Sequence, residues 1–184
     1  MNMRKLLLII AVLLSAFSTT HADNKKKKAE QDTQAWNYEV ETISKNKTGG
    51  YILKVWSYSK DVNVAEEQSK KNAVHAVVFK GVPEGSGQVR TPGIKALIPN
   101  DSSRPDDEFF SNFFADGGDY MRYVTVSNNG FADVIKLPKK KRDGTDKKSV
   151  YKFKVGLTVT VDVPALRKYL EGKGKIKSLS AGFN

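Results

Sequence analysis

Few side chains in this sequence could serve as a nucleophile, a general base or a transition-metal ligand. The chain has 184 residues, no cysteine and two histidines, His21 and His75. A catalytic triad or a zinc site needs several such groups close together. His75 lies in the mainly apolar segment 72–78, where a core or boundary histidine is expected rather than a catalytic base. The sequence therefore predicts no catalytic residue of this kind, no transition-metal site, no thiol chemistry and no cofactor.

Carboxylates, the other groups capable of catalysis, occur in two small clusters. Residues 106–108 stand at the start of a predicted helix, where negative charge is favoured by the helix dipole. Asp116 and Asp119 flank two glycines and lack the ligand spacing of a calcium loop. Isolated glycine pairs at 85–87 and 172–174 lack the remaining positions of a nucleotide-binding loop. A hydrolase that uses Asp or Glu stays open as an alternative, because the separation of carboxylates in space is not visible in a sequence.

Four phenylalanines form the first candidate binding group. Phe109, Phe110, Phe113 and Phe114 are spaced as neighbours on one face of a helix predicted over residues 105–115. Such a face usually belongs to the core. Any part of it that stays exposed would form a patch for a partner. We therefore take these residues as candidate partner-binding residues, with burial in the core as the alternative.

Basic residues form the second candidate group. Lys and Arg number 31 against 20 Asp and Glu, which gives a net charge of +11. Basic clusters occur at 25–28, 139–142, 147–148 and 173–177, all in predicted loops or tails. The candidate residues among them are Lys139, Lys140, Lys141 and Arg142. Nucleic-acid binding motifs interleave such charges with aromatic residues, and here the two lie on different segments, so no nucleic-acid partner is predicted. These residues are candidates for binding an anionic envelope glycan or lipid, with a solvated basic surface as the alternative.

The elements that must position these groups follow from hydrophobic periodicity. Strands are predicted over 36–43, 51–59, 119–127 and 150–161, with a short edge strand over 176–183, and helices over 63–80, 105–115 and 163–171. A turn at 128–130 leads into a short segment over 131–137. In the strand 51–59, Leu53 and Val55 share one face, and Trp56 and Tyr58 share the other. The order of elements predicts an α+β fold: an antiparallel sheet of about four to five strands with two to three helices packed on one face.

The helix over 63–80 is predicted in more detail. Asn63 is expected to open it as part of a capping box, and Gly81 to end it. Its N-terminal half, which contains Lys70 and Lys71, is expected to face water. Small residues at positions 65, 69, 73 and 76 would allow a close approach to the strands. Residues 82–104 are expected to form a long functional or mobile loop.

The start of the chain carries an export pattern. Arg4 and Lys5 precede an apolar run of twelve residues, 6–17, and a small polar region that ends at Ala22. The run is short of the roughly 20 residues that a membrane span needs. We expect a signal peptide over 1–22, a disordered polar spacer over 23–35 and one α+β domain over 36–184. The mature chain, cleaved near Ala22, would be periplasmic or secreted and would contain no transmembrane segment.

Three stretches, residues 65–81, 113–123 and 166–179, resemble a family of uncharacterised exported proteins from Gram-negative bacteria. More distantly, the two strands, alanine-spaced helix and later strand pair are similar to the N-terminal domain of the flagellar assembly protein FlgT and to small envelope lipoprotein domains. This chain lacks the lipid-acceptor cysteine of the lipoproteins. The resemblance implies a role in envelope structures without enzymatic activity.

Together these features predict a non-enzymatic exported protein of the cell envelope with a binding or assembly role. Its partner would be an envelope protein or an anionic envelope polymer. A carboxylate-dependent hydrolase and an electrostatic binder of anionic glycans or lipids are the alternatives.

Overall fold

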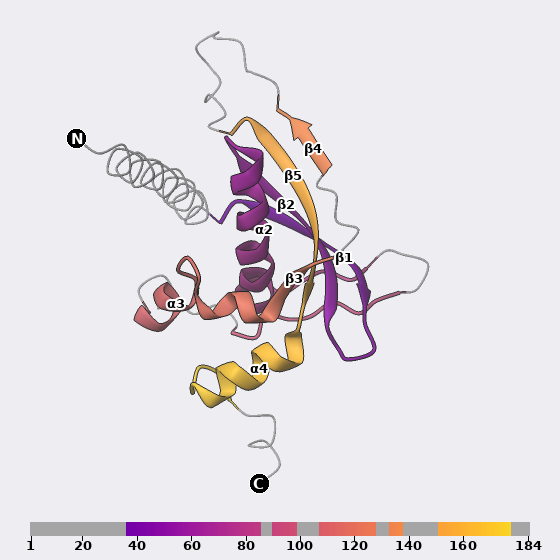
Figure 1. The fold of residues 1–184 in the computed structure, drawn as a ribbon. Helices are drawn as coiled ribbons and strands as arrows, with labels where there is room; N and C mark the ends of the chain where they lie inside the picture. The colour runs from indigo at the N-terminus through magenta and orange to yellow at the C-terminus, as the bar shows by residue number, and fades with distance from the viewer. Residues whose placement is uncertain (1–35, 86–89, 99–106, 128–132, 138–150, 178–184) are drawn as a thin grey trace, which may run out of the picture.

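The computed structural model describes residues 36–85, 90–98, 107–127, 133–137 and 151–177 (Figure 1). Along the chain the elements are β1 (Tyr38–Lys45), β2 (Tyr51–Ser59), α2 (Val62–His75), the π-helical η1 (Ala76–Lys80), α3 (Glu108–Phe113), the 3-10 helix η2 (Asp119–Tyr123), β3 (Val124–Val126), β4 (Asp133–Lys136), β5 (Phe153–Val161) and α4 (Val163–Gly172). Within the described residues, five strands form one antiparallel sheet and three α-helices accompany it. The predicted α+β fold is confirmed. The predicted signal peptide and spacer lie outside the described residues.

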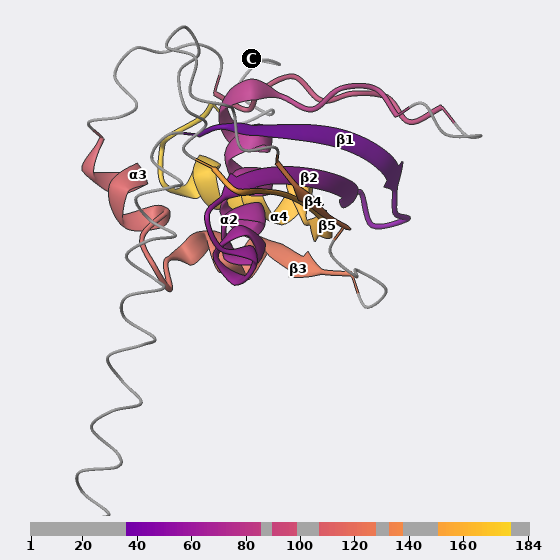
Figure 2. The same cartoon turned by 90° about the horizontal axis from the view of Figure 1, so that it is seen from above.

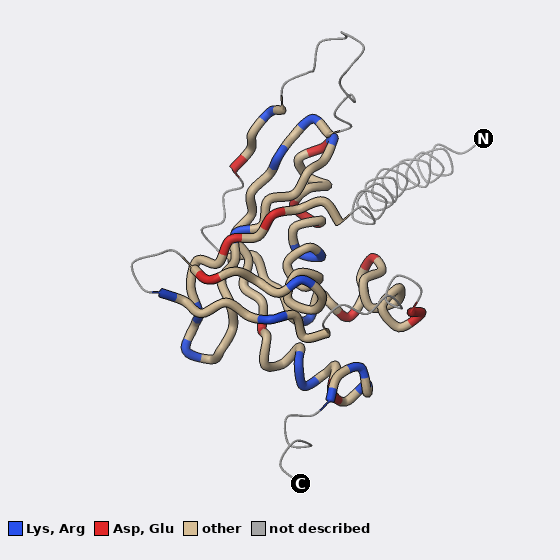
Figure 3. The backbone as a smooth tube through the Cα atoms, turned by 180° about the vertical axis from the view of Figure 1, so that it is seen from behind, with Lys and Arg blue, Asp and Glu red and all other residues tan. Residues whose placement is uncertain are grey.

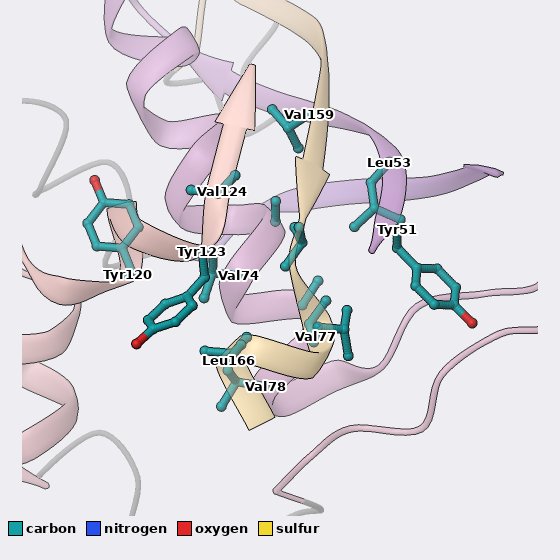
Figure 4. Packing of buried hydrophobic residues seen from close by; sticks show 14 of the residues in the cluster. Tyr51, Leu53, Val74, Val77, Val78, Tyr120, Tyr123, Val124, Val159 and Leu166 are labelled. Carbon is teal, nitrogen blue, oxygen red and sulfur yellow. The ribbon is translucent and has the colours of Figure 1, made fainter. Parts of the chain in front are cut away.

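The sheet is built around β2 and β5, its two central strands. The strand order is β1-β2-β5-β3, and β4 also pairs with β5. Alternate side chains of a strand point to opposite faces. Accordingly Leu53 and Val55 of β2 lie beside Leu157 and Val159 of β5 on the buried face. Figure 4 shows Leu53 and Val159 of these strands together with residues of the covering helix.

Helix α2 lies along the buried face of the sheet (Figure 2). The helix begins one residue before the predicted start. Its N-cap is Asp61 rather than the predicted Asn63, because the Asp61 carboxylate accepts a hydrogen bond from the Asn63 backbone N–H at 2.9 Å. The residues at the four small positions are fully buried: Ala65, Ser69, Ala73 and Ala76. The predicted close approach of helix and sheet is therefore confirmed.

One expectation for α2 is wrong. Lys71 does not face water, because its side chain is 2 % exposed and its Nζ lies 2.9 Å from the Asp116 carboxylate. Its ammonium group also lies 5.9 Å from the centre of the buried Tyr120 ring. The N-terminal half of the predicted helix 63–80 therefore has a buried side, which contacts the segment after α3. Helical periodicity alone did not show this contact.

The last turn of the predicted helix is a π-helix, η1. Gly81 ends it with a φ of +79°, and the Gly81 N–H donates to the Ala76 carbonyl. The carbonyl groups at a helix end lack partners within the helix. Here the backbone N–H groups of residues 97 and 98 donate to the carbonyls of Val77 and Val78, at 3.1 and 2.8 Å. Residues 97 and 98 of the predicted long loop thus cap the helix.

Part of the predicted loop over 82–104 is an ordered ribbon. Two isolated bridges, Val82 with Ile94 and Gly85 with Thr91, join its two sides. The Thr42 hydroxyl donates to the Pro83 carbonyl at 2.6 Å. The ribbon is thereby fixed against β1.

The far edge of the sheet differs from the prediction. The first part of the predicted strand 119–127 is the 3-10 helix η2, because Tyr120 and Tyr123 are both buried on one side of a helical turn. Only residues 124–126 form a strand, β3, which pairs with residues 159–161 of β5. β4 pairs with residues 153–156 of the same strand. β3 and β4 therefore follow one another along one side of β5.

Helix α4 closes one end of the core. Asp162 caps it as an acceptor for the Ala165 N–H at 3.0 Å, and Leu166 and Leu170 are fully buried. Leu166 lies near Val78 in Figure 4. Of the edge strand predicted over 176–183, only residues 176 and 177 are described, and they form no strand.

Candidate functional site

The four candidate phenylalanines do not share one environment. Phe110, Phe113 and Phe114 are 7, 3 and 8 % exposed and belong to the core, as the alternative interpretation had it. Phe109 is half-buried, and its ring lies 6.2 Å from that of Tyr169. Contact with a partner at this helix stays a prediction, and Phe109 is the member with the most accessible side chain. The other candidate group, residues 139–142, lies outside the described residues.

His75 lies in an aromatic cluster. Its ring stacks on Trp36 with 3.6 Å between ring centres and an angle of 17°. Its Nδ1 is 2.6 Å from the Tyr38 hydroxyl oxygen. Burial raises the pKa of Tyr38 far above its ordinary value, so we assign the phenol as the donor in this hydrogen bond. The histidine thus contributes to the core.

The carboxylates of the two acidic clusters have separate partners. Asp107 accepts from the Phe109 N–H and lies 2.7 Å from the Lys175 ammonium group, which is the main reason that the pKa of Asp107 is lowered. Asp116 pairs with Lys71, as described above. Asp119 accepts a hydrogen bond from the Tyr169 hydroxyl at 2.6 Å. In the part of the chain that the structure describes, no three His, Cys, Asp or Glu side chains gather as a metal site.

The face of the sheet opposite α2 has a different character. None of the described helices covers it, and we call it the open face (Figure 2). Both acidic and basic positions occur along the strands in Figure 3. We define the open face by six side chains from three neighbouring strands: Glu39 and Glu41 of β1, Lys54, Trp56 and Tyr58 of β2, and Lys154 of β5.

Trp56 lies at the centre of the open face. Its cross-strand neighbour is Gly156. A Cβ atom at position 156 would lie only 2.6–2.9 Å from three carbons of the indole ring, so the ring rests directly on the glycine backbone. The indole Nε1–H donates to Glu41 Oε1 at 2.7 Å. The absence of a side chain at Gly156 and this hydrogen bond together hold the ring over the sheet.

Tyr58 repeats this arrangement two residues along the strand. Its hydroxyl donates to the Glu39 carboxylate, which also accepts from Lys154 Nζ at 2.7 Å. Lys154, and to a lesser degree Tyr58, lower the pKa of Glu39. The hydrogen bond to Glu39 is in turn the main reason that the pKa of Tyr58 is raised. Glu39 is therefore held as an anion and Tyr58 as a neutral phenol.

The lysines complete two similar sets of side chains. The ammonium groups of Lys54 and Lys154 lie 4.8 and 5.1 Å from the centre of the Trp56 ring. Lys54 also pairs with Asp133 of β4. One set comprises Trp56, Glu41 and Lys54, and the other comprises Tyr58, Glu39 and Lys154. Each contains an aromatic ring, a carboxylate and an ammonium group, and the two rings are offset by two residues along β2, roughly 6.6–6.8 Å.

Sequence reasoning did not select this site. Alternation placed Trp56 and Tyr58 on the strand face opposite Leu53 and Val55, and two large aromatic residues on that face were the available signal. Comparison of the chain with protein-family models, with curated proteins and with solved structures gives no match. Among the described residues, no helix has the length and apolar character required to cross a membrane.

Proposed function

We propose that this chain is a non-enzymatic binding protein of the cell envelope and that the open face is its binding surface. One observation carries the proposal: two aromatic rings, Trp56 and Tyr58, are fixed by hydrogen bonds on a sheet face that no described helix covers. Rigid aromatic side chains with polar edges supply contact area at low entropic cost, which is why they are enriched in binding surfaces. The export pattern of residues 1–22 supports the envelope as the location.

The chemistry of the described residues favours binding over catalysis. A general acid needs a carboxyl group with a raised pKa. Glu39 and Asp107 have lowered pKa values instead, because each accepts hydrogen bonds from an ammonium group and other donors. His75 is buried against Trp36. These groups are suited to fixing geometry and accepting hydrogen bonds.

Retention on isolated cell envelopes tests the proposal. The tagged full chain is expressed in a Gram-negative host, and the fraction that sediments with washed envelopes is compared between the wild type, Trp56→Ala and Phe109→Ala. We expect Trp56→Ala to lose most of the retention and Phe109→Ala to keep it, with circular dichroism confirming that both variants are folded. Equal retention of the wild type and Trp56→Ala would refute the open face as the binding surface. Turnover of an envelope substrate by the purified protein would refute the non-enzymatic assignment.

A further inference from the structure

We infer that the ligand of the open face is an uncharged glycan chain, whose successive sugar rings stack on Trp56 and Tyr58. The inference rests on the proposed function, since it names the ligand class of that surface. It follows from three properties of the described residues: the orientation of the aromatic rings, the repetition of the side-chain sets and the balance of charge.

The first property is the fixed orientation of the rings. The C–H groups of a pyranose ring form an apolar face that stacks on a flat aromatic ring, while its hydroxyl groups point outward to polar partners. Trp56 rests on Gly156 and is tied to Glu41 at its Nε1 edge, so the ring is already ordered when a ligand arrives. The ammonium groups of Lys54 and Lys154 lie over the same ring, and a stacked sugar would displace them from it. Groups that are ordered before binding lose less entropy in the complex.

The second property is repetition. Tyr58, Glu39 and Lys154 repeat the chemistry of Trp56, Glu41 and Lys54 after two residues along β2. Residues i and i+2 of a strand are about 6.6–6.8 Å apart along the backbone and point to the same face, so the two rings follow one another along β2. Two similar side-chain sets in succession fit a polymer of repeating units.

The third property is the balance of charge. Three carboxylates, Glu39, Glu41 and Asp133, lie beside two ammonium groups, Lys54 and Lys154. A polyanion would require an excess of positive charge. Hydroxyl groups both donate and accept, so a polyol can use the remaining lone pairs of the carboxylates and the remaining N–H donors of the lysines.

The same residues are less suited to a protein partner. The centre of a protein–protein interface is usually depleted of charged residues. Here the charged side chains stand between and beside the two rings, and both lysines contact the central Trp56 ring. A polar polymer therefore fits the centre of this surface better than the apolar core of a protein interface.

Tryptophan fluorescence gives the direct test. The chain has two tryptophans, Trp36 and Trp56, and only Trp56 lies on the open face. The purified full chain is titrated with chitotetraose, with cellotetraose and, as a polyanion, with heparin, each at low and high salt. We expect saturable binding of at least one neutral tetrasaccharide that is insensitive to salt.

Variants assign any binding to the open face. Trp56→Ala removes the fluorescent reporter, so the affinities of all variants are measured by calorimetry. We expect a loss of about tenfold or more for Trp56→Ala, a smaller loss for Trp56→Phe and no change for Glu67→Ala, a substitution on the exposed side of α2. The conservative Trp56→Phe keeps the test valid if the alanine variant does not fold.

Each result has a defined meaning. Neutral-glycan binding that Trp56 variants weaken supports the inference. Binding of heparin alone, abolished by salt, overturns it in favour of a polyanion. If no glycan binds while envelope retention still depends on Trp56, the glycan inference is overturned and the proposed function stands. If retention is also independent of Trp56, both are overturned.

Discussion

The buried ion pair between Lys71 and Asp116 gives a quantitative prediction. Lys71 is 2 % exposed and Asp116 is 29 % exposed, so the two partners differ in their access to water. Removing Asp116 leaves an ammonium group inside the protein without its counter-ion, whereas removing Lys71 leaves a carboxylate that water can partly reach. Loss of one partner of a fully buried pair costs about 3–5 kcal/mol. Because position 116 is partly exposed, we expect about 2–3 kcal/mol for Asp116→Ala and about 1 kcal/mol or less for Lys71→Met.

Thermal and denaturant unfolding at neutral pH check these values. For a chain of this size, 1 kcal/mol corresponds to about 2–4 °C in Tm, so Asp116→Ala should lower the Tm by roughly 4–12 °C. The adjacent pair of Lys70 and Glu67, 21 and 53 % exposed, supplies a matched control. Glu67→Ala should cost about 0.5 kcal/mol or less. The reasoning fails if Asp116→Ala costs no more than Glu67→Ala, or if Lys71→Met is as costly as Asp116→Ala.

Three further predictions concern the sheet and its covering helix. Glu39 has a folded-state pKa below its ordinary value of 4.5, so its carboxylate stabilises the fold above that pH and loses this effect as the pH falls through the folded pKa. The Tm difference between the wild type and Glu39→Gln should therefore shrink below about pH 4.5. A Tm difference that does not change with pH would contradict this prediction. Gly156→Ala should lift the Trp56 ring from the sheet and shift its fluorescence. The free energy of unfolding should change by about 1 kcal/mol or less, because alanine is favoured over glycine in a strand. An unchanged fluorescence spectrum would show that the ring does not lie on residue 156. Ala73→Leu should cost about 1–3 kcal/mol by overpacking the helix–sheet contact, as measured by urea unfolding, and a neutral effect would mean that the contact is loose.

The central strands could be predicted from the sequence because their patterns are local. The predicted strand 51–59 coincides with β2, whose side chains alternate between buried and half-buried throughout. The predicted strand 150–161 contains β5 at 153–161. Small residues along α2 likewise indicated the contact with the sheet. In each case, one periodic pattern of side chains decides both the type of element and the face that it buries.

The departures arise where long-range contacts decide the structure. Residues 119–123 alternate well enough for a strand, yet Tyr120 and Tyr123 are buried together by a helical turn. Lys71 is polar and was assigned to the wet side of α2, because its counter-ion is 45 residues away. To predict the open face, one would also need the register between β2 and β5, which places Gly156 opposite Trp56. No local sequence pattern contains this register.

The split edge beside β5 has a consequence for self-association. An uninterrupted edge strand is a template on which another chain can pair and extend the sheet. Here the described part of that edge consists of two short strands, β3 with three residues and β4 with four. Apolar side chains are exposed on both pieces, Val126 on one and Val134 and Ile135 on the other. Each of these two short strands therefore offers an incoming strand only a few backbone groups, which limits extension of the sheet at this edge.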